Sequence, residues 1–398
     1  MPSSTSSSDR MTSAERLTAA DRPGVAQPVP ERPVPVKPWG RIALAVAVLT
    51  AAATAMWEWR MRALELLPGD IQDNASFWAD QRRRVDTEDI QVAIVGDSRI
   101  LFDTDLSRFE ALTGVRPLQL GLAGTNARPF LENLAADPHF KGLALVGISE
   151  TSYFRKETGL HEDVMARYHF ESPAQRASFL LYGRLSNVFG FLDAEYRLSK
   201  LLWRLDHGLR SGATNPYIEP WKFSTTRADR QTALWSRIET DVYLNGHARA
   251  FWSRLYSAPI ISDEIIAMTQ KTTRDAVAAI RAHGGDVIFL RPPSRGLYRK
   301  NEDRMAPRDR AWTPLLAAAG VQGLHAEDDP VASHLFLPEF SHLTAACSTV
   351  YTDSYVRRLT QLTPRLTLRA DAPAPLSPND CPPTTEALAV QKILEGGS

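Results

Sequence analysis

Apolar and polar residues alternate with two different periods along most of the chain, and this pattern predicts the secondary structure. Short runs rich in β-branched and aliphatic residues, bounded by turn residues, predict buried strands. We expect these strands at residues 89–96, 116–122, 143–148, 286–290 and 321–325. Longer stretches with helical spacing predict helices at residues 75–84, 106–112, 128–136, 261–282, 308–319 and 343–362. Because strands alternate with helices, we expect a three-layer α/β fold with a mainly parallel sheet and helices on both faces.

The pattern changes between the third and the fourth predicted strand. Residues 152–262 contain many aromatic residues and are interpreted as helices and loops, which predicts a helical insertion in an α/β domain of residues 86–362. Within the insertion, residues 179–205 are strongly apolar with interleaved charges. This segment could form a lid, a helix on a membrane surface, or a helix packed on the sheet, and we favour the last.

The two ends of the chain have a different composition from the domain. Residues 1–38 are rich in Ser, Thr, Pro and alternating charges, so they cannot bury enough apolar surface to offset their ordering entropy. We therefore expect a disordered N-terminal tail. Residues 363–398 are rich in proline and are expected to form a mobile C-terminal tail.

An uncharged apolar run, IALAVAVLTAAATAMW, occupies residues 42–57. Flanking tryptophan and arginine residues extend it to a possible membrane span of residues 39–60, close to the ~20 residues that a bilayer requires. Nothing before the run could pack with it in a core. The sequence Ala53-Thr54-Ala55 would suit a cleaved signal peptide, but the preceding region of about 40 residues is unusually long for one. We favour an uncleaved signal anchor.

The positive charges around the run indicate its orientation. Arg32, Lys37 and Arg41 precede it, whereas Arg60 and Arg62 follow it. Since positive charges collect on the cytoplasmic side, the N-terminus is expected inside. The chain would then be a single-pass inner-membrane protein, if its source is bacterial, with the C-terminal domain in the periplasm or outside.

Charge and cysteine content exclude some classes of function. The chain has 46 basic and 46 acidic residues, so no overall basic field indicates nucleic-acid binding. Its two cysteines, Cys347 and Cys381, do not have the spacing of a zinc site. They would suit one disulfide in an oxidising compartment, or two free thiols. We expect no metal and no cofactor.

Ser98 lies where the first predicted strand ends, in the sequence Gly96-Asp97-Ser98. The carboxyl ends of parallel strands form the ligand crevice of an open α/β sheet, so Ser98 could present its hydroxyl there. Alternatively, Asp97 or Ser98 only caps the next helix.

His342 directly precedes the last predicted helix, and Glu339 lies three residues before it. A neutral imidazole can accept the proton of a serine, and a carboxylate on its other nitrogen fixes the tautomer. The alternative is a solvated loop, and Asp328, Asp329 and His334 lie close enough to compete for these roles.

Three blocks of sequence together resemble the SGNH/GDSL hydrolase superfamily. They are Gly96-Asp97-Ser98, residues 120–126 (LGLAGTN) and residues 339–344 (EFSHLT), and the resemblance covers about residues 90–150 and 285–362. It implies a flavodoxin-like sheet, with Ser98 as nucleophile, His342 as general base and Glu339 as the orienting acid. It also implies an oxyanion hole formed by the N–H groups of Ser98 and Gly124.

One block departs from the family pattern. Where the family has Gly-x-Asn-Asp after the third strand, this chain has Gly147-Ile148-Ser149-Glu150. The third oxyanion donor is therefore expected to be Ser149 or Asn126, or to be missing, and each donor can change the rate ~10²–10³-fold.

The departures and the predicted anchor make the chain resemble the membrane-anchored branch that acts with polysaccharide O-acetylation and D-alanylation systems. This implies a serine acyltransferase or esterase acting on acyl esters of a cell-surface polymer. Its partners would be a glycan or acyl-ester substrate and a membrane-embedded acyl donor. The alternative is a non-catalytic scaffold of a membrane assembly.

Arg291 and Arg295 follow the fourth strand and could bind an anionic substrate group, unless they are surface residues of a turn.

Overall fold

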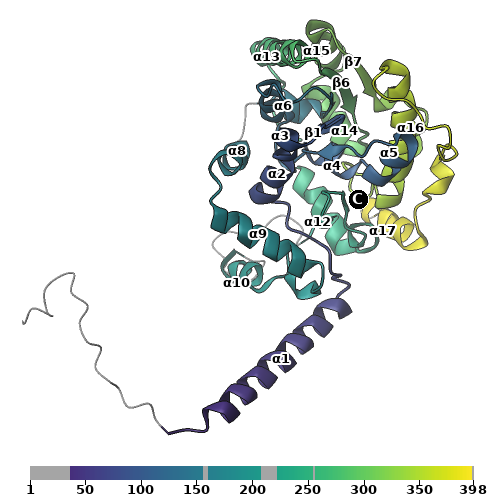
Figure 1. Ribbon diagram of the computed structural model, residues 1–398. Helices are drawn as coiled ribbons and strands as arrows, with labels where there is room; N and C mark the ends of the chain where they lie inside the picture. Colours follow the sequence, from purple (N-terminus) through teal and green to yellow (C-terminus); the bar gives the residue numbers. More distant parts are fainter. Residues whose placement is uncertain (1–35, 156–159, 208–221, 254–255, 397–398) are drawn as a thin grey trace, which may run out of the picture. The chain divides into compact units, whose positions relative to one another are not determined.

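The structure is a computed structural model that describes residues 36–155, 160–207, 222–253 and 256–396. It has an α/β fold with one long N-terminal helix (Figure 1). The sheet has five strands in the order β2-β1-β3-β6-β7, and all neighbouring strands are parallel. These strands are β1 (Val92–Gly96), β2 (Leu118–Gln119), β3 (Leu143–Gly147), β6 (Asp286–Arg291) and β7 (Gln322–His325). The predicted fold class is confirmed.

The longer helices around the sheet were nearly all predicted, whereas several short ones were not. The observed helices are α2 (Ala75–Arg82), α3 (Arg84–Thr87), α4 (Ser98–Phe102), α5 (Leu106–Thr113), α6 (Ala127–Ala135), α7 (Glu150–Tyr153), α13 (Asp263–Ala282), α14 (Gly296–Met305), α15 (Trp312–Ala319), α16 (Ala345–Leu362) and α17 (Thr385–Gly396). Helices α4, α14 and α17 did not emerge from the sequence pattern. They have five to twelve residues and pack close to the candidate site, where tertiary contacts outweigh local propensity.

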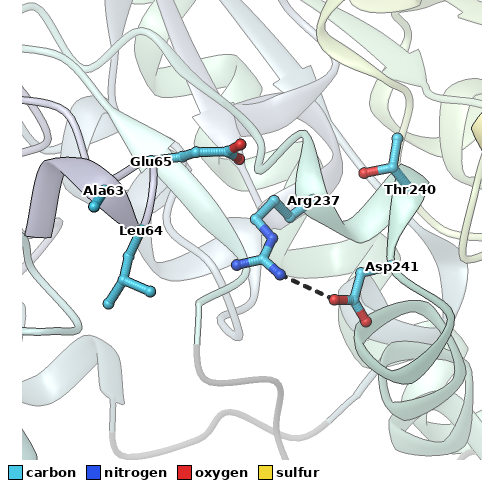
Figure 2. Close-up of a pocket in the computed structure, with 6 residues that line it drawn as sticks. All are labelled: Ala63, Leu64, Glu65, Arg237, Thr240 and Asp241. Atoms are coloured by element: carbon cyan, nitrogen blue, oxygen red, sulfur yellow. Dashed lines mark hydrogen bonds and ion pairs between the residues drawn. The ribbon is translucent and has the colours of Figure 1, made fainter. Parts of the chain in front are cut away.

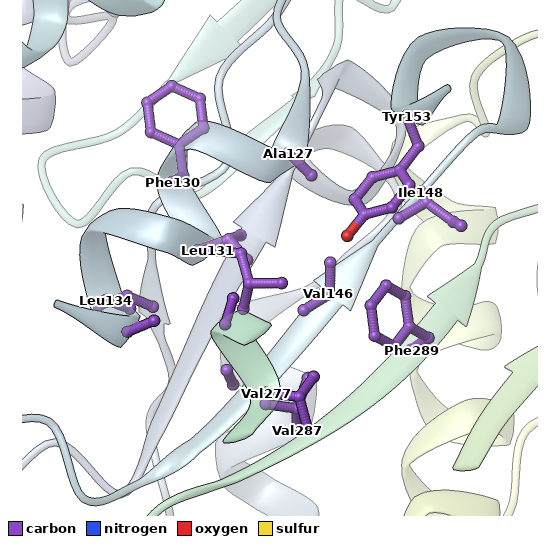
Figure 3. Packing of buried hydrophobic residues seen from close by; sticks show 14 of the residues in the cluster. Ala127, Phe130, Leu131, Leu134, Val146, Ile148, Tyr153, Val277, Val287 and Phe289 are labelled. Carbon is purple, nitrogen blue, oxygen red and sulfur yellow. The ribbon is translucent and has the colours of Figure 1, made fainter. Parts of the chain in front are cut away.

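The sheet is apolar on both faces because helices cover it on both sides. Alternate residues of β1 and β3, such as Val95 and Val146, join a core cluster with α6, α13 and α15. Figure 3 shows this cluster, with Phe289 of β6 near Val146 of β3. The residues between them, such as Ile94, face a second cluster with α5 and α16. This arrangement gives the three predicted layers.

The insertion between β3 and β6 is mainly helical, as predicted. It contains α8 (Leu160–Phe170), α9 (Pro173–Ser186), α10 (Leu198–His207), α11 (Arg237–Thr240) and α12 (Val242–Ser253). It also contains an antiparallel hairpin that the sequence did not predict, formed by β4 (Ser224–Thr226) and β5 (Thr232–Leu234). Part of the predicted insertion lies outside the described residues.

The apolar segment of residues 179–205 does not pack on the sheet. Within α9 only Ser186 is buried. The interpretation that we favoured was therefore wrong for α9. The reason is that α5, α6, α13, α15 and α16 already cover both faces of the sheet.

Helix α1 (Trp39–Ala63) is 25 residues long and is apolar enough to cross a membrane. At 1.5 Å per residue it is about 37 Å long, more than the ~30 Å of a bilayer core. It could be an anchor or a signal sequence. The chain divides after Met56 into two compact units, so the last turns of α1 belong to the larger unit, residues 57–398.

The domain extends beyond both predicted boundaries. At its start, Trp78 is completely buried in the core. At its end, residues 363–396 do not form a free tail, because a disulfide joins Cys381 to Cys347 of α16, and Ala387 and Val390 of α17 are buried. A disulfide fits an extracytoplasmic domain.

Two paired glycines make room for the helix that carries Ser98. Gly96 of β1 and Gly147 of β3 lie side by side in register. A Cβ atom on Gly147 would lie 2.1 Å from Cβ of Ile100, and one on Gly96 would lie 2.2 Å from Cγ2 of the same residue. Ile100 is completely buried, so it cannot move aside without repacking.

We predict that Gly147→Ala lowers the free energy of unfolding by about 1–3 kcal/mol through overpacking. The measurement is denaturant unfolding of the purified chain. Gly183→Ala in α9 is the matched control, because its Cβ would have only an ordinary contact with Ile71, at 3.9 Å. The control should be neutral or more stable by up to about 1 kcal/mol. Equal stability of the two variants would refute this account of the glycine pair.

Candidate active site

Ser98, His342 and Glu339 form one continuous hydrogen-bonded chain. Nε2 of His342 lies 2.9 Å from Oγ of Ser98, and Nδ1 lies 2.9 Å from Oε1 of Glu339. The same carboxylate oxygen accepts the backbone N–H of His342 at 2.6 Å. With the proton on Nδ1, the imidazole donates to Glu339 and its Nε2 is free to accept the serine proton. The structure thus brings Ser98 together with two residues that lie more than 240 positions further along the sequence.

The end of β1 explains the position of Ser98. Asp97 caps α4, since its Oδ1 accepts the backbone N–H of Arg99 at 3.1 Å. Ser98 is the first residue of α4, so its backbone N–H has no acceptor within the helix. Asp97 therefore has the capping role that we considered as an alternative, and this role leaves the hydroxyl of Ser98 available to His342.

The loop that carries Glu339 and His342 is held from several sides. The carbonyl of Pro338 accepts hydrogen bonds from Asn245 and Arg249 of α12 and from Gln391 of α17. The backbone of Phe340 has a positive φ of 77°, which costs a non-glycine residue roughly 1–2 kcal/mol. Its carbonyl accepts the backbone N–H of Arg295 at 2.9 Å. These contacts fix the direction of the Glu339 side chain.

Trp252 is a site residue that the sequence did not identify. Its indole N–H, on α12, donates to the second carboxylate oxygen of Glu339. The rings of Phe102, Phe223 and Trp252 lie 4.6, 5.4 and 5.7 Å from the imidazole of His342. His342 is 1% exposed and Glu339 is completely buried, whereas Ser98 is only half-buried. The imidazole of His342 and the carboxylate of Glu339 are thus shielded from water, and the insertion supplies part of the shield.

The expected oxyanion donors differ in their partners. Gly124 lies in an exposed turn after β2 with a φ of 74°, and its N–H donates to none of the described residues. Ser149, in contrast, donates its hydroxyl to Oδ2 of Asp97 at 2.7 Å. Asn126 caps α6 with its oxygen and donates its amide to the carbonyl of Arg155 at 3.1 Å. Both candidates for the third donor are therefore bound inside the protein.

Arg291 is directed into the protein and not towards a substrate. It is 1% exposed and donates to Glu302 at 2.7 Å and to Glu150 at 3.2 Å. Burial alone would raise the pKa of Glu150, but Arg291 and His325 outweigh it and hold that pKa far below its usual range. The arginine is thus needed to balance buried charge.

Arg295 is half-buried, and its guanidinium donates to the carbonyl of Ser333. The structure therefore gives both arginines internal partners. The sequence could not show this, since it fixes only their place after β6.

A pocket of about 370 Å³ lies at the end of α1. It is lined by Ala63, Leu64, Glu65, Arg237, Thr240 and Asp241 (Figure 2). Arg237 donates to Asp241 across one side of it at 3.1 Å. None of the predicted site residues lines this pocket.

Comparison with models of known families and with curated proteins gives no match for this chain. The identification of the site therefore depends on the sequence blocks and on the geometry described above.

Asp103 connects the helix of Ser98 to the loop of His342. It follows α4, is completely buried, and accepts the backbone N–H of Leu343 with Oδ1 at 2.9 Å. Its Oδ2 has no hydrogen-bond partner among the described residues. Burial raises the pKa of the Asp103 carboxyl well above its ordinary value.

We predict opposite effects for two substitutions of Asp103. The carboxyl stabilises the folded state only while it is protonated, because burial raises its folded-state pKa. This stabilisation is complete below about pH 4, the pKa of Asp in an unfolded chain, and is lost as the pH rises through the folded-state pKa. Asp103→Asn keeps an acceptor for Leu343 and does not titrate, so its stability relative to wild type should improve between pH 4 and pH 8. Asp103→Ala should cost about 1–3 kcal/mol, because it leaves a buried N–H without an acceptor. Denaturant unfolding across this pH range measures both effects. If the free energies of unfolding of Asp103→Asn and wild type differ by the same amount at every pH, the prediction for Asp103→Asn is wrong.

Proposed function

We propose that this chain is a membrane-anchored serine acyltransferase or esterase of the SGNH/GDSL type, acting on acyl esters of a cell-surface polymer. One observation carries the proposal: the unbroken hydrogen-bonded chain Ser98–His342–Glu339 at the carboxyl edge of a parallel sheet. A serine, a neutral imidazole and a buried carboxylate in this order constitute an activated nucleophile.

The proposed reaction has two half-reactions. Oγ of Ser98 attacks the acyl carbonyl carbon while its proton passes to Nε2 of His342. The negative oxygen that forms is stabilised by the N–H groups of Ser98 and Gly124. The ester C–O bond then breaks, and the leaving oxygen takes the proton from Nε2. A hydroxyl of the acceptor glycan, or water, next loses its proton to Nε2 and attacks the carbonyl carbon of the acyl-Ser98 ester. The bond between this carbon and Oγ then breaks, and Oγ takes the proton back from Nε2, which restores Ser98 and the neutral imidazole.

The end of α1 favours transfer from a membrane-embedded donor. Met61 and Leu66, at this end, belong to the same apolar cluster as Phe102, whose ring lies 4.6 Å from that of His342. If α1 is an anchor, the apolar cluster at its end includes a ring that packs against the imidazole of His342. Anchoring would raise the effective concentration of Ser98 near an acyl donor in the membrane, with a glycan as acceptor.

A non-catalytic scaffold of a membrane assembly is the second candidate. It is favoured by Ser149 and Asn126, which are bound internally and leave only backbone donors for an oxyanion. Loss of one such donor typically costs ~10²–10³-fold in rate. The reactivity of Ser98 distinguishes the two candidates, because a scaffold has no need for an activated serine.

We predict that a membrane-impermeant, serine-reactive phosphonate labels Ser98 on intact spheroplasts. Mass spectrometry of the isolated chain locates the adduct. Ser98→Ala should abolish the labelling, and His342→Ala should slow it by several orders of magnitude because the general base is lost. Labelling only after the membrane has been permeabilised would place the domain inside and refute the topology. No labelling in either preparation, with a control esterase labelled in parallel, would favour the scaffold.

We further predict that Trp252→Phe slows labelling of Ser98 about tenfold. The substitution removes the indole donor from Glu339, and a hydrogen bond to a charged group contributes about 1.5–3 kcal/mol. Trp312→Phe in α15 is the control, since Trp312 is more buried than the half-buried Trp252 but contributes to the core beneath the sheet. Thermal unfolding of both variants tests for a general loss of stability. Equal labelling rates in the two variants would remove Trp252 from the site.

A further inference from the structure

Helix α9 has an apolar stripe that no part of the described chain covers. Leu181, Leu185 and Val188 lie at helical spacing in α9 and just beyond its end, and all three are exposed, Leu181 by 59%. Side chains at i, i+4 and i+7 share one face of a helix. Burying such a face against another apolar phase is favourable, so an uncovered stripe of this kind usually marks a contact surface.

The apolar surface continues on α10. Leu198 and Leu202 lie one helical turn apart, and both are exposed by more than half. The two helices are connected through Tyr182 of α9, whose hydroxyl donates to the carbonyl of Leu192 at 2.7 Å. The guanidinium of Arg197, next to α10, lies 5.7 Å from the centre of the same ring. We call the exposed side chains of α9 and α10 the α9–α10 surface.

The segment between α9 and α10 is bound to the last turns of α1. The carboxylate of Glu58 accepts the backbone N–H groups of Gly190 and Phe191, both at 3.0 Å. Arg62 donates to the carbonyl of Val188 at 3.3 Å. A helix that crosses a bilayer emerges at the level of the lipid headgroups. The segment bound to its end therefore lies close to that level.

The charges and aromatic residues around this point suit a lipid surface. Arg176 and Arg184 are exposed on α9, where they could contact anionic headgroups. Trp57 and Trp59 are exposed on the last turns of α1, and tryptophan is enriched at the membrane–water interface. A second copy of the chain fits less well, because a two-fold contact through this surface would bring these arginines close to their own copies.

We infer that the α9–α10 surface lies in the headgroup layer of the bilayer that α1 crosses, and so fixes the orientation of the domain on the membrane. The inference rests on the anchoring role of α1 in the proposed function. The insertion thus has two roles. Trp252 of α12 shields the imidazole, and the α9–α10 surface holds the site at the membrane surface.

The experiment uses the full chain, because its only two cysteines are joined in a disulfide and leave no thiol to label. Leu181→Cys is labelled with an environment-sensitive fluorophore and reconstituted into vesicles of phosphatidylethanolamine and phosphatidylglycerol. Met268→Cys is the control, since Met268 is exposed on α13, far from α9 in Figure 1. Lipids with a nitroxide near the headgroup should quench most of the emission at position 181 and leave position 268 unchanged.

Further variants and outcomes make the test decisive. Leu185→Glu combined with Arg184→Glu should abolish the quenching at position 181 without changing the labelling of Ser98 by a soluble phosphonate. Equal quenching at positions 181 and 268 would overturn the inference and leave the proposed function intact. A blue shift that grows with the protein-to-lipid ratio, without nitroxide quenching, would assign the surface to a second copy and overturn it too. If alkaline carbonate extracts the chain from the vesicles, the anchor is refuted and the inference with it.

Discussion

A charge-balanced cluster of two arginines and two glutamates lies beneath the site, and the geometry of the strand ends depends on it. Arg99 follows β1, Glu150 follows β3 and Arg291 ends β6, while Glu302 of α14 accepts hydrogen bonds from both arginines. All four side chains are buried, so each charge is tolerable only while its partners remain. Removing one member of such a cluster typically costs about 3–5 kcal/mol.

The same cluster includes the end of the block Gly147-Ile148-Ser149-Glu150, which departs from the pattern of the family that the sequence resembles. In this chain Glu150 binds Arg291, and Ser149 binds Asp97 next to the nucleophile. Both residues join neighbouring strand ends. The hydroxyl of Ser149 is thereby engaged inside the protein, next to the hydrogen-bonded chain of Ser98, His342 and Glu339.

The sequence predicted those parts of the structure that follow from local pattern and chain topology. Strand periodicity gave the parallel sheet, and Ser98 and His342 could be paired because each borders an element at the same sheet edge. Trp252 and Asp103 could not be found in this way. Their partners are 87 and 240 positions away, and nothing in an isolated indole or carboxylate specifies which distant group it will meet. The partners of Ser149, Asn126 and Arg291 were missed for the same reason.

The C-terminal segment was misjudged because its proline content indicates only a stiff backbone. Its position is set by a single disulfide, which joins Cys381 to Cys347.

The contact between α17 and the loop of Glu339 has a consequence for the order of assembly. Gln391 donates to the carbonyl of Pro338 at 3.1 Å, and the disulfide of Cys381 holds the segment that leads to it. A nascent chain that has not yet released residues 385–396 lacks this donor, and a reduced chain lacks the covalent link between Cys381 and α16. The loop then has fewer restraints on the side chain of Glu339. Completion of the loop around Glu339 is thereby coupled to the docking of α17 and to formation of the disulfide, so the surroundings of His342 are fully assembled only when α17 is in place.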